Sequence, residues 1–309
     1  MRKAIRYIFI ALIAAILIGL PAIAAPPPVS TAEMLATLER TLYGAVSEGS
    51  VIPRVVKLET AAFGAEGDGT LTERIEKLWN EFGGGREGVQ SQDYLVKCSQ
   101  WIVDGKLSQG ALLDRVSKLE EALMGYVSRE PLAKRISRIL SMTAGSGGIE
   151  TQYVKLAAGT QVKVILKSPL RTNFTRPGEK IDLEVADDVF VGGYLAIAKG
   201  SAWQAEAVDP TKSPKFDLKN ILELALSPLQ AIDLTPVKLI ADEAAAAATL
   251  KLSGLVISQG ERAERLGFFG TGNAVDRLLP GSKNLDIIRD TAFFLTVRED
   301  VSVLAAKVK

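Results

Sequence analysis

The chain has 309 residues, with 37 Lys plus Arg against 36 Asp plus Glu, and it contains no histidine. This balance leaves no basic excess for the phosphate contacts on which nucleic-acid binding rests. The absence of histidine excludes Ser-His-Asp and Cys-His catalysis and removes the commonest zinc ligand. A chain of this length is expected to form about two domains.

The first 24 residues have the order of a secretory signal peptide. Three basic residues come first, namely Arg2, Lys3 and Arg6. An uncharged apolar run follows as far as Leu20, and Pro21 and the small residues around Ala22 and Ala24 come after it. This order predicts a signal peptide over residues 1–24, with cleavage after Ala24.

The alternative is an N-terminal membrane anchor, because the apolar run approaches the about 20 residues of a spanning helix. Residues 25–30 contain three consecutive prolines and would form a short extended spacer. The predicted location is extracytoplasmic: the periplasm, the cell envelope or the medium. Contact with a membrane is expected only if the N-terminal segment stays uncleaved.

The single cysteine, Cys98, cannot form an intramolecular disulfide. Pairing between molecules is one option for an odd cysteine in a secreted chain. Leu95, Cys98 and Ile102 fall at helical spacing, which favours a small buried residue in a helix.

Residues 31–142 repeat with a period of 20, and we interpret residues 84–105 as one degenerate copy. Arg54 and Arg74 share the spacing with the pair Arg115 and Arg135. Each copy carries apolar residues at steps of four and three, as in the set Leu71, Ile75, Leu78 and Phe82. This pattern predicts a helix of some 13 residues with one apolar stripe, followed by a turn. Such helices must stack into an array or bundle to be stable.

The expected helix boundaries agree with this interpretation. Capping-box spacing joins Ser30 to Glu33 and Thr70 to Glu73. A helix start is favoured at Pro131. Glycines that would need a positive φ at helix ends are Gly44, Gly64, Gly83 and Gly125.

The repeated Arg, Lys and Glu residues lie beside the apolar stripe. They predict a solvated face with pairs between residues i and i+4. The alternative is a repeated contact surface for an envelope polymer or an envelope protein. The loop 65–70 (AEGDGT) has oxygen donors and glycines but lacks the calcium-loop pattern, so no metal site is predicted there.

Residues 143–150 contain the sequence TAGSGG and predict a flexible linker between two separately folding halves. Residues 151–309 contain short β-branched or alternating runs between glycine turns, which is typical of a barrel or sandwich. The expected strands are 161–166, 181–185, 189–191, 194–198, 202–208, 237–240, 250–252, 255–257 and 293–297. Residues 218–226 fit a strand or a short helix, and 244–248 a helical turn or loop insertion. The predicted fold class is α+β with two domains.

The repeats and the start of the β-rich half both resemble known patterns. The units with Arg-x-x-x-Leu-Glu and a closing Phe-Gly resemble helical repeats of uncharacterised secreted or envelope proteins of bacteria. The string AAGTQVKVIL and the segment from PGEKIDLEV to AKGSAWQAEAV resemble a Gly-Thr-opened β-rich domain of such proteins, with TAFFLTVREDVSV (291–303) as its closing strand. The resemblance implies an envelope or secreted protein and brings no reaction or catalytic residue.

Other motifs carry little chemistry. Asp187 and Asp188 are neighbours, which on a strand would face opposite ways, so they are interpreted as acids at a turn. The run 267–272 (GFFGTG) lacks the Lys-Ser/Thr of a phosphate loop, and no nucleotide is expected. Trp79, Trp101 and Trp203 are expected to fill cores.

No catalytic, cofactor-binding or metal-binding residue is therefore predicted, and no cofactor. The favoured function is an exported, non-catalytic envelope or secreted protein that binds a partner or has a structural role. The alternative is an extracytoplasmic hydrolase that acts on glycan with carboxylates alone. Two facing carboxylates in a deep cleft would favour the hydrolase.

Overall fold

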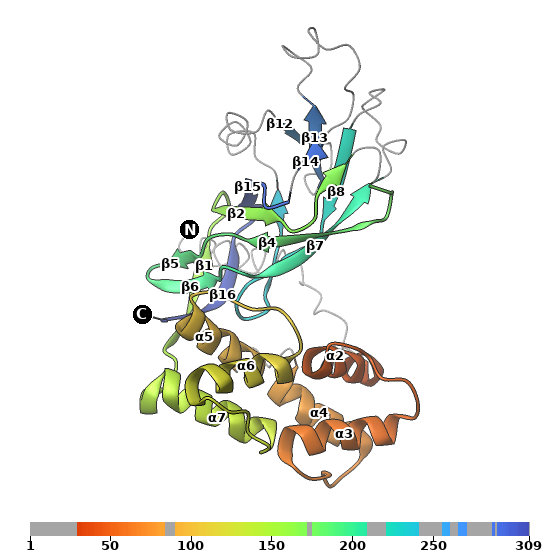
Figure 1. Cartoon of the computed structure of the whole chain (residues 1–309), viewed down its shortest axis with the longest axis vertical. Helices are drawn as coiled ribbons and strands as arrows, with labels where there is room; N and C mark the ends of the chain where they lie inside the picture. Colours follow the sequence, from red (N-terminus) through yellow and green to blue (C-terminus); the bar gives the residue numbers. More distant parts are fainter. Residues whose placement is uncertain are drawn as a thin grey trace, which may run out of the picture.

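The computed structural model describes residues 30–83, 90–171, 175–208, 221–240, 255–259, 265–270, 286–287 and 289–308. The predicted signal peptide and nearly all of the spacer lie outside these ranges, as do the expected elements at 244–248 and 250–252. Helices make up the N-terminal region and strands the C-terminal one (Figure 1), which confirms the α+β prediction. None of the described helices is both long and apolar enough to span a membrane.

The described part of the helical region has six α-helices at the predicted spacing. They are α2 (Thr31–Tyr43), α3 (Val51–Phe63), α4 (Leu71–Phe82), α5 (Gln92–Asp104), α6 (Leu112–Met124) and α7 (Leu132–Thr143). The predicted stripes are buried, and all six helices contribute to one apolar cluster. Within it α2 packs on α4 and α5 packs on α7. We call α2–α4 and α5–α7 the two groups of three helices, and contacts of α3 with α7 and of α2 with α6 join them.

The helix ends follow the sequence signals with one exception. Thr70 and Glu73 form a complete capping box, and Gly44, Gly64 and Gly125 end their helices in the left-handed conformation. The prediction is wrong at Gly83, whose φ is −84°. A Cβ there would collide with the ring and backbone of Trp79, so this glycine permits a close approach instead of a left-handed turn.

The prediction of a solvated charged face is wrong for the repeated Arg and Glu residues. Glu39, Glu59 and Glu120 are at most 1% exposed. Each accepts hydrogen bonds from the arginine 15 residues later in the chain, at the start of the next helix. The ion-pair distances are 2.6 Å for Arg54–Glu39, 2.5 Å for Arg74–Glu59 and 2.8 Å for Arg135–Glu120. We call this arrangement the Arg–Glu clasp.

The clasp also fixes the loop between its two helices. The backbone N–H of Ser47 donates to Glu39, and that of Ser128 donates to Glu120, each eight residues after the glutamate. A buried carboxylate needs such donors and a cation to offset its loss of hydration. The period of 20 therefore repeats a polar joint as well as an apolar stripe.

The β-rich region contains an eight-stranded and a four-stranded antiparallel sheet, with strand orders β11-β15-β2-β4-β7-β8-β13-β12 and β1-β16-β6-β5. Small two-stranded sheets pair β9 with β10 and β3 with β14. The strands are β1 (Thr151–Leu156), β2 (Gln161–Leu166), β3 (Leu170–Arg171), β4 (Lys180–Val185), β5 (Val189–Val191), β6 (Tyr194–Ile197), β7 (Ala202–Val208), β8 (Ile221–Leu226), β9 (Leu229–Gln230), β10 (Pro236–Val237), β11 (Leu239–Ile240), β12 (Leu255–Gln259), β13 (Arg265–Gly270), β14 (Asp286–Ile287), β15 (Ala292–Val297) and β16 (Val301–Ala306).

Both large sheets face one apolar core, because inward side chains of β1, β2, β4, β7, β15 and β16 share a cluster. The burial alternates along β2 and β4, as the period of two requires. The ambiguous run 218–226 contains strand β8. The first four residues of GFFGTG (267–270) belong to β13, which pairs with β8 and β12, so Gly267 and Gly270 lie in a sheet.

A third apolar cluster joins the two regions. Helix α5 contributes Tyr94, Cys98 and Trp101, and the loop after it contributes Leu107. Their partners in the β-rich region include Leu195 and Ala306. Cys98 is fully buried there, as predicted, and burial raises the pKa of its thiol to about 12. Helix α5 is thus packed on the sheets, and Figure 1 shows it beside β6 and β16.

Candidate functional site

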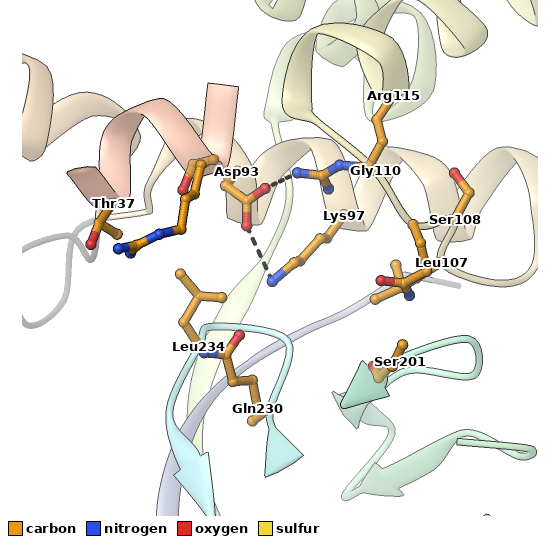
Figure 2. A pocket seen from close by; sticks show the side chains of 15 residues that line it. Thr37, Asp93, Lys97, Leu107, Ser108, Gly110, Arg115, Ser201, Gln230 and Leu234 are labelled. Atoms are coloured by element: carbon orange, nitrogen blue, oxygen red, sulfur yellow. Dashed lines mark hydrogen bonds and ion pairs between the residues drawn. The ribbon is translucent and has the colours of Figure 1, made fainter. Parts of the chain in front are cut away.

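A polar cleft of about 280 Å³ lies where the helical region meets the β-rich region. One wall is built from α2, α5 and the start of α6, and the other from the β6–β7 and β9–β10 turns. Figure 2 shows the side chains converging from these elements. The lining residues are Thr37, Arg40, Thr41, Asp93, Lys97, Leu107, Ser108, Gln109, Gly110, Arg115, Ser201, Ala202, Gln230, Ala231 and Leu234.

Asp93 is the centre of the helical wall. Lys97, one turn later on α5, lies 3.1 Å from its Oδ2, and Arg115 from α6 bonds its Oδ1 (Figure 2). Burial raises the pKa of Asp93, but the two cations outweigh it and hold that pKa at about 2. Asp93 is therefore an ionised structural anion near neutral pH, and it cannot donate a proton as a general acid.

The opposite wall is held close by bonds between the two regions. The N–H of Leu107 donates to the carbonyl of Lys199 at 2.8 Å. Gln109 donates its side-chain amide to the carbonyl of Gly200 at 2.5 Å. Gly200 must be a glycine, because its φ is +83° and a Cβ would collide with the Leu107 backbone. The α5–α6 loop is thereby fixed to the β6–β7 turn, at the edge of the cleft.

The β9–β10 turn, on the same wall, carries backbone strain. Leu234 lies between β9 and β10 with a φ of 72°. A branched residue in the left-handed region costs of order 1–3 kcal/mol, and such residues concentrate at functional sites. Asp233 supports this turn by accepting from the N–H and hydroxyl of Thr235 and from the N–H of Leu304.

The acids singled out from the sequence lie outside the cleft. Asp187 pairs with Lys163 at 3.0 Å. The Oδ1 of Asp188 accepts from the Trp101 indole at 2.9 Å and from the Lys199 N–H at 2.7 Å. The two neighbours have different partners, as expected of acids at a turn, and Asp188 helps to dock α5 on the sheet.

The other sequence candidates have structural partners. In the loop 65–70, Glu66 pairs with Arg74 at 3.1 Å. The described residues contain no group of three acidic or cysteine ligands that could hold a metal ion. Trp101 and Trp203 are each 8% exposed, as expected of core residues.

The sequence interpretation missed Asp93, Lys97 and Gln100. Gln100 occupies the place that the clasps give to a glutamate, and it accepts from Arg115 at 3.4 Å, 15 residues later. Because an amide is neutral, the carboxylate for Arg115 comes from Asp93 instead. This departure lies in the copy that the sequence marked as degenerate, and that irregularity was the available signal.

No family model matches the chain, and no curated protein matches its sequence. One solved structure aligned with it is that of ComB10 of the Com type IV secretion system of Helicobacter pylori. The alignment has 14% identity and a TM-score of 0.26, and it covers 48% of this chain and 90% of that chain. A TM-score this low does not establish a shared fold.

Proposed function

We propose that the chain is an exported, non-catalytic protein of the cell envelope or the medium, and that it binds its partner in the interdomain cleft. The observation that carries this proposal is the composition of that cleft. Among its described lining residues Asp93 is the one carboxylate, and Lys97 and Arg115 both bind it. A hydrolase working with carboxylates alone needs two that face each other.

The burial of the clasps makes the cleft a better candidate binding surface than the helical array. A row of repeated arginines and glutamates would suit an extended polymer only if the side chains faced solvent. Arg115 and Arg135 are 6% and 7% exposed and are already paired. The repeated charges therefore hold the helices together, and the cleft is the better candidate for contact with an envelope polymer or an envelope protein.

Export is supported by the order of basic, apolar and small residues at the N-terminus and by the resemblance to secreted and envelope proteins. Mass spectrometry of the protein recovered from the extracytoplasmic fraction should find an N-terminus near Ala25. Recovery of intact Met1 in a membrane-embedded form would support the anchor instead.

The binding proposal is tested by co-sedimentation with isolated cell-wall polymer and with envelope membranes. Gln230 is exposed at the cleft, so Gln230→Trp should fill the entrance and abolish retention. Gln152→Trp is the matched control on β1, because Gln152 is also exposed but lies outside the cleft. Equal retention of both variants would reject the cleft. Glycan or peptide turnover that Asp93→Asn removes would reject a non-catalytic role.

A further inference from the structure

We infer that the cleft binds a compact oxyanion, a carboxylate or a phosphate, carried at the end of a larger molecule. This inference rests on the proposed function, because it names the chemical group that the same cleft receives. Among the described lining residues, three side chains are cationic, Arg40, Lys97 and Arg115, and only Asp93 carries a carboxylate. The lining therefore has two positive charges in excess.

The one carboxylate among the described lining residues is already shared by two of these cations. Each oxygen of Asp93 already has a cation, with Lys97 at Oδ2 and Arg115 at Oδ1. The Lys97 ammonium has three donors, and Asp93 is its one ion-pair partner among the described residues. The Nε of Arg115 also has no hydrogen-bond partner, but it is buried and does not open into the cleft. The unmatched positive charge that a ligand can reach therefore lies on Lys97 and Arg40, and it favours an anionic group that accepts hydrogen bonds.

Arg40 adds a cation that has no ion pair among the described residues. It is exposed in the last turn of α2, and no carboxylate of the described residues forms an ion pair with it. Arginine suits carboxylate and phosphate because its planar fork can donate two parallel bonds. Arg40 and Lys97 thus offer donors from two different helices.

Comparison with the regular copies of the repeat shows that the charges of Asp93 and Lys97 are specific to α5. In the other clasps one buried glutamate neutralises one arginine. At the positions equivalent to Asp93 the regular copies have Ala32, Ile52 and Leu113. At those equivalent to Lys97 they have Ala36, Val56 and Ser117. Helix α5 therefore brings a carboxylate and an extra cation to the place where neutral Gln100 replaces a glutamate, and the surplus charge faces the cleft.

The volume of the cleft and its apolar lining residues limit the kind of molecule that can carry the oxyanion. A volume of about 280 Å³ lies just below the roughly 300–1,000 Å³ of sites for drug-sized ligands, so a chain end fits and a whole oligomer does not. Leu107 and Leu234 add apolar surface near the polar groups. A terminal carboxylate of a peptide and a phosphate of a polyol polymer both meet these conditions.

Isothermal titration of the purified full chain with two acids tests the inference. The probes are N-acetyl-dialanine and glycerol phosphate, with N-acetyl-dialanine amide and glycerol as their uncharged counterparts. One acid should bind saturably at a single site, and its counterpart should not bind. Peptide binding assigns a carboxylate source, and glycerol phosphate binding assigns a phosphate source.

Two pairs of variants locate the site. Lys97→Met should weaken binding by about 10-fold to 100-fold, as expected for the loss of a hydrogen bond to a charged group. The Lys97→Met variant should still fold, because Arg115 still pairs with Asp93. Lys118→Met removes the same charge from an exposed position of α6 and should leave affinity unchanged. Arg40→Gln should cost less than Lys97→Met, about fivefold, since Arg40 is exposed; Arg129→Gln is its control.

Three results would overturn the inference. They are the absence of saturable binding by either acid, equal binding of an acid and its uncharged counterpart, and equal losses in Lys97→Met and Lys118→Met. If envelope material is still retained through the cleft while neither acid binds, the proposed function stands and the oxyanion inference fails.

Discussion

The two groups of three helices share one repeat but differ in what surrounds their polar joints. In α2–α4, Glu39 and Glu59 are each matched by the arginine of the next helix, and these joints hold the helices together and, at Glu39, the loop between them. In α5–α7 the first joint has Gln100 in place of a glutamate, and Asp93 and Lys97 enter beside it. The same group carries the apolar contact with the sheets. The copy that departs from the repeat supplies Asp93 and Lys97 to the cleft, and α2 of the other group completes the helical wall with Thr37, Arg40 and Thr41.

The largest expected effect comes from opening a clasp. Arg135→Met leaves Glu120 fully buried without its cation, and we expect a loss of about 3–5 kcal/mol in the free energy of unfolding. Arg138 on the same helix is the control, because its pair with Glu130 is over one-third exposed on both sides. Arg138→Met should cost at most about 1 kcal/mol. Equal costs in urea unfolding would show that the clasp adds nothing to stability.

The buried stripe should matter nearly as much as the clasp. Leu78 is fully buried in α4, and Leu78→Ala should cost about 2–5 kcal/mol because it leaves a cavity. Glu76 is exposed on the same helix, so Glu76→Ala should change stability little. Small and equal effects would contradict burial of the stripe.

The contact between the two regions predicts coupled unfolding instead of the independent unfolding that the linker suggested. We expect one thermal transition for the wild type and resistance to proteolysis over residues 142–150. Gly200→Ala should split the transition, since overpacking against Leu107 costs about 1–3 kcal/mol beyond the backbone strain. Gly178→Ala is the control, with the same φ of +83° and open space around the new methyl. Two transitions in the wild type would contradict the coupling.

Acid should weaken the polar joints of both groups of helices. The pKa of Glu59 is lowered from 4.5 by Arg74 and that of Asp93 falls from 3.8 to about 2, so each carboxylate stabilises the fold above its usual pKa. This stability is lost as the pH falls through the lowered value. Asp93 should account for about 2 kcal/mol that is lost between about pH 4 and pH 2.

Hydrogen exchange during acidification checks the contribution of Asp93. In Asp93→Asn the change between about pH 4 and pH 2 should shrink, whereas the exposed Asp114→Asn should keep it. A full pH response in Asp93→Asn would assign the effect to another group.

The sequence by itself determined the helices, their length, their buried stripe and most strands, because these depend on periods of 3.6 and 2 that are local. It also marked 84–105 as irregular. The partners of the charged residues were decided by tertiary structure alone. Glu39 and Arg54 are 15 residues apart, and only the turn of the chain between α2 and α3 brings their side chains within 2.6 Å. A charge beside an apolar stripe looks the same in sequence whether it faces water or a neighbouring helix.

The cleft likewise depends on contacts that no local pattern encodes. Arg40, Lys97 and Leu234 come from three elements separated by tens of residues, and they meet because α5 packs on the sheets. The sequence could supply the types of these residues and the break in the repeat at Gln100. These residues converge, and give the cleft its excess of positive charge, because apolar surface far apart in the sequence is buried together. Such burial is not directional, so it produces no regular spacing of residues in the sequence.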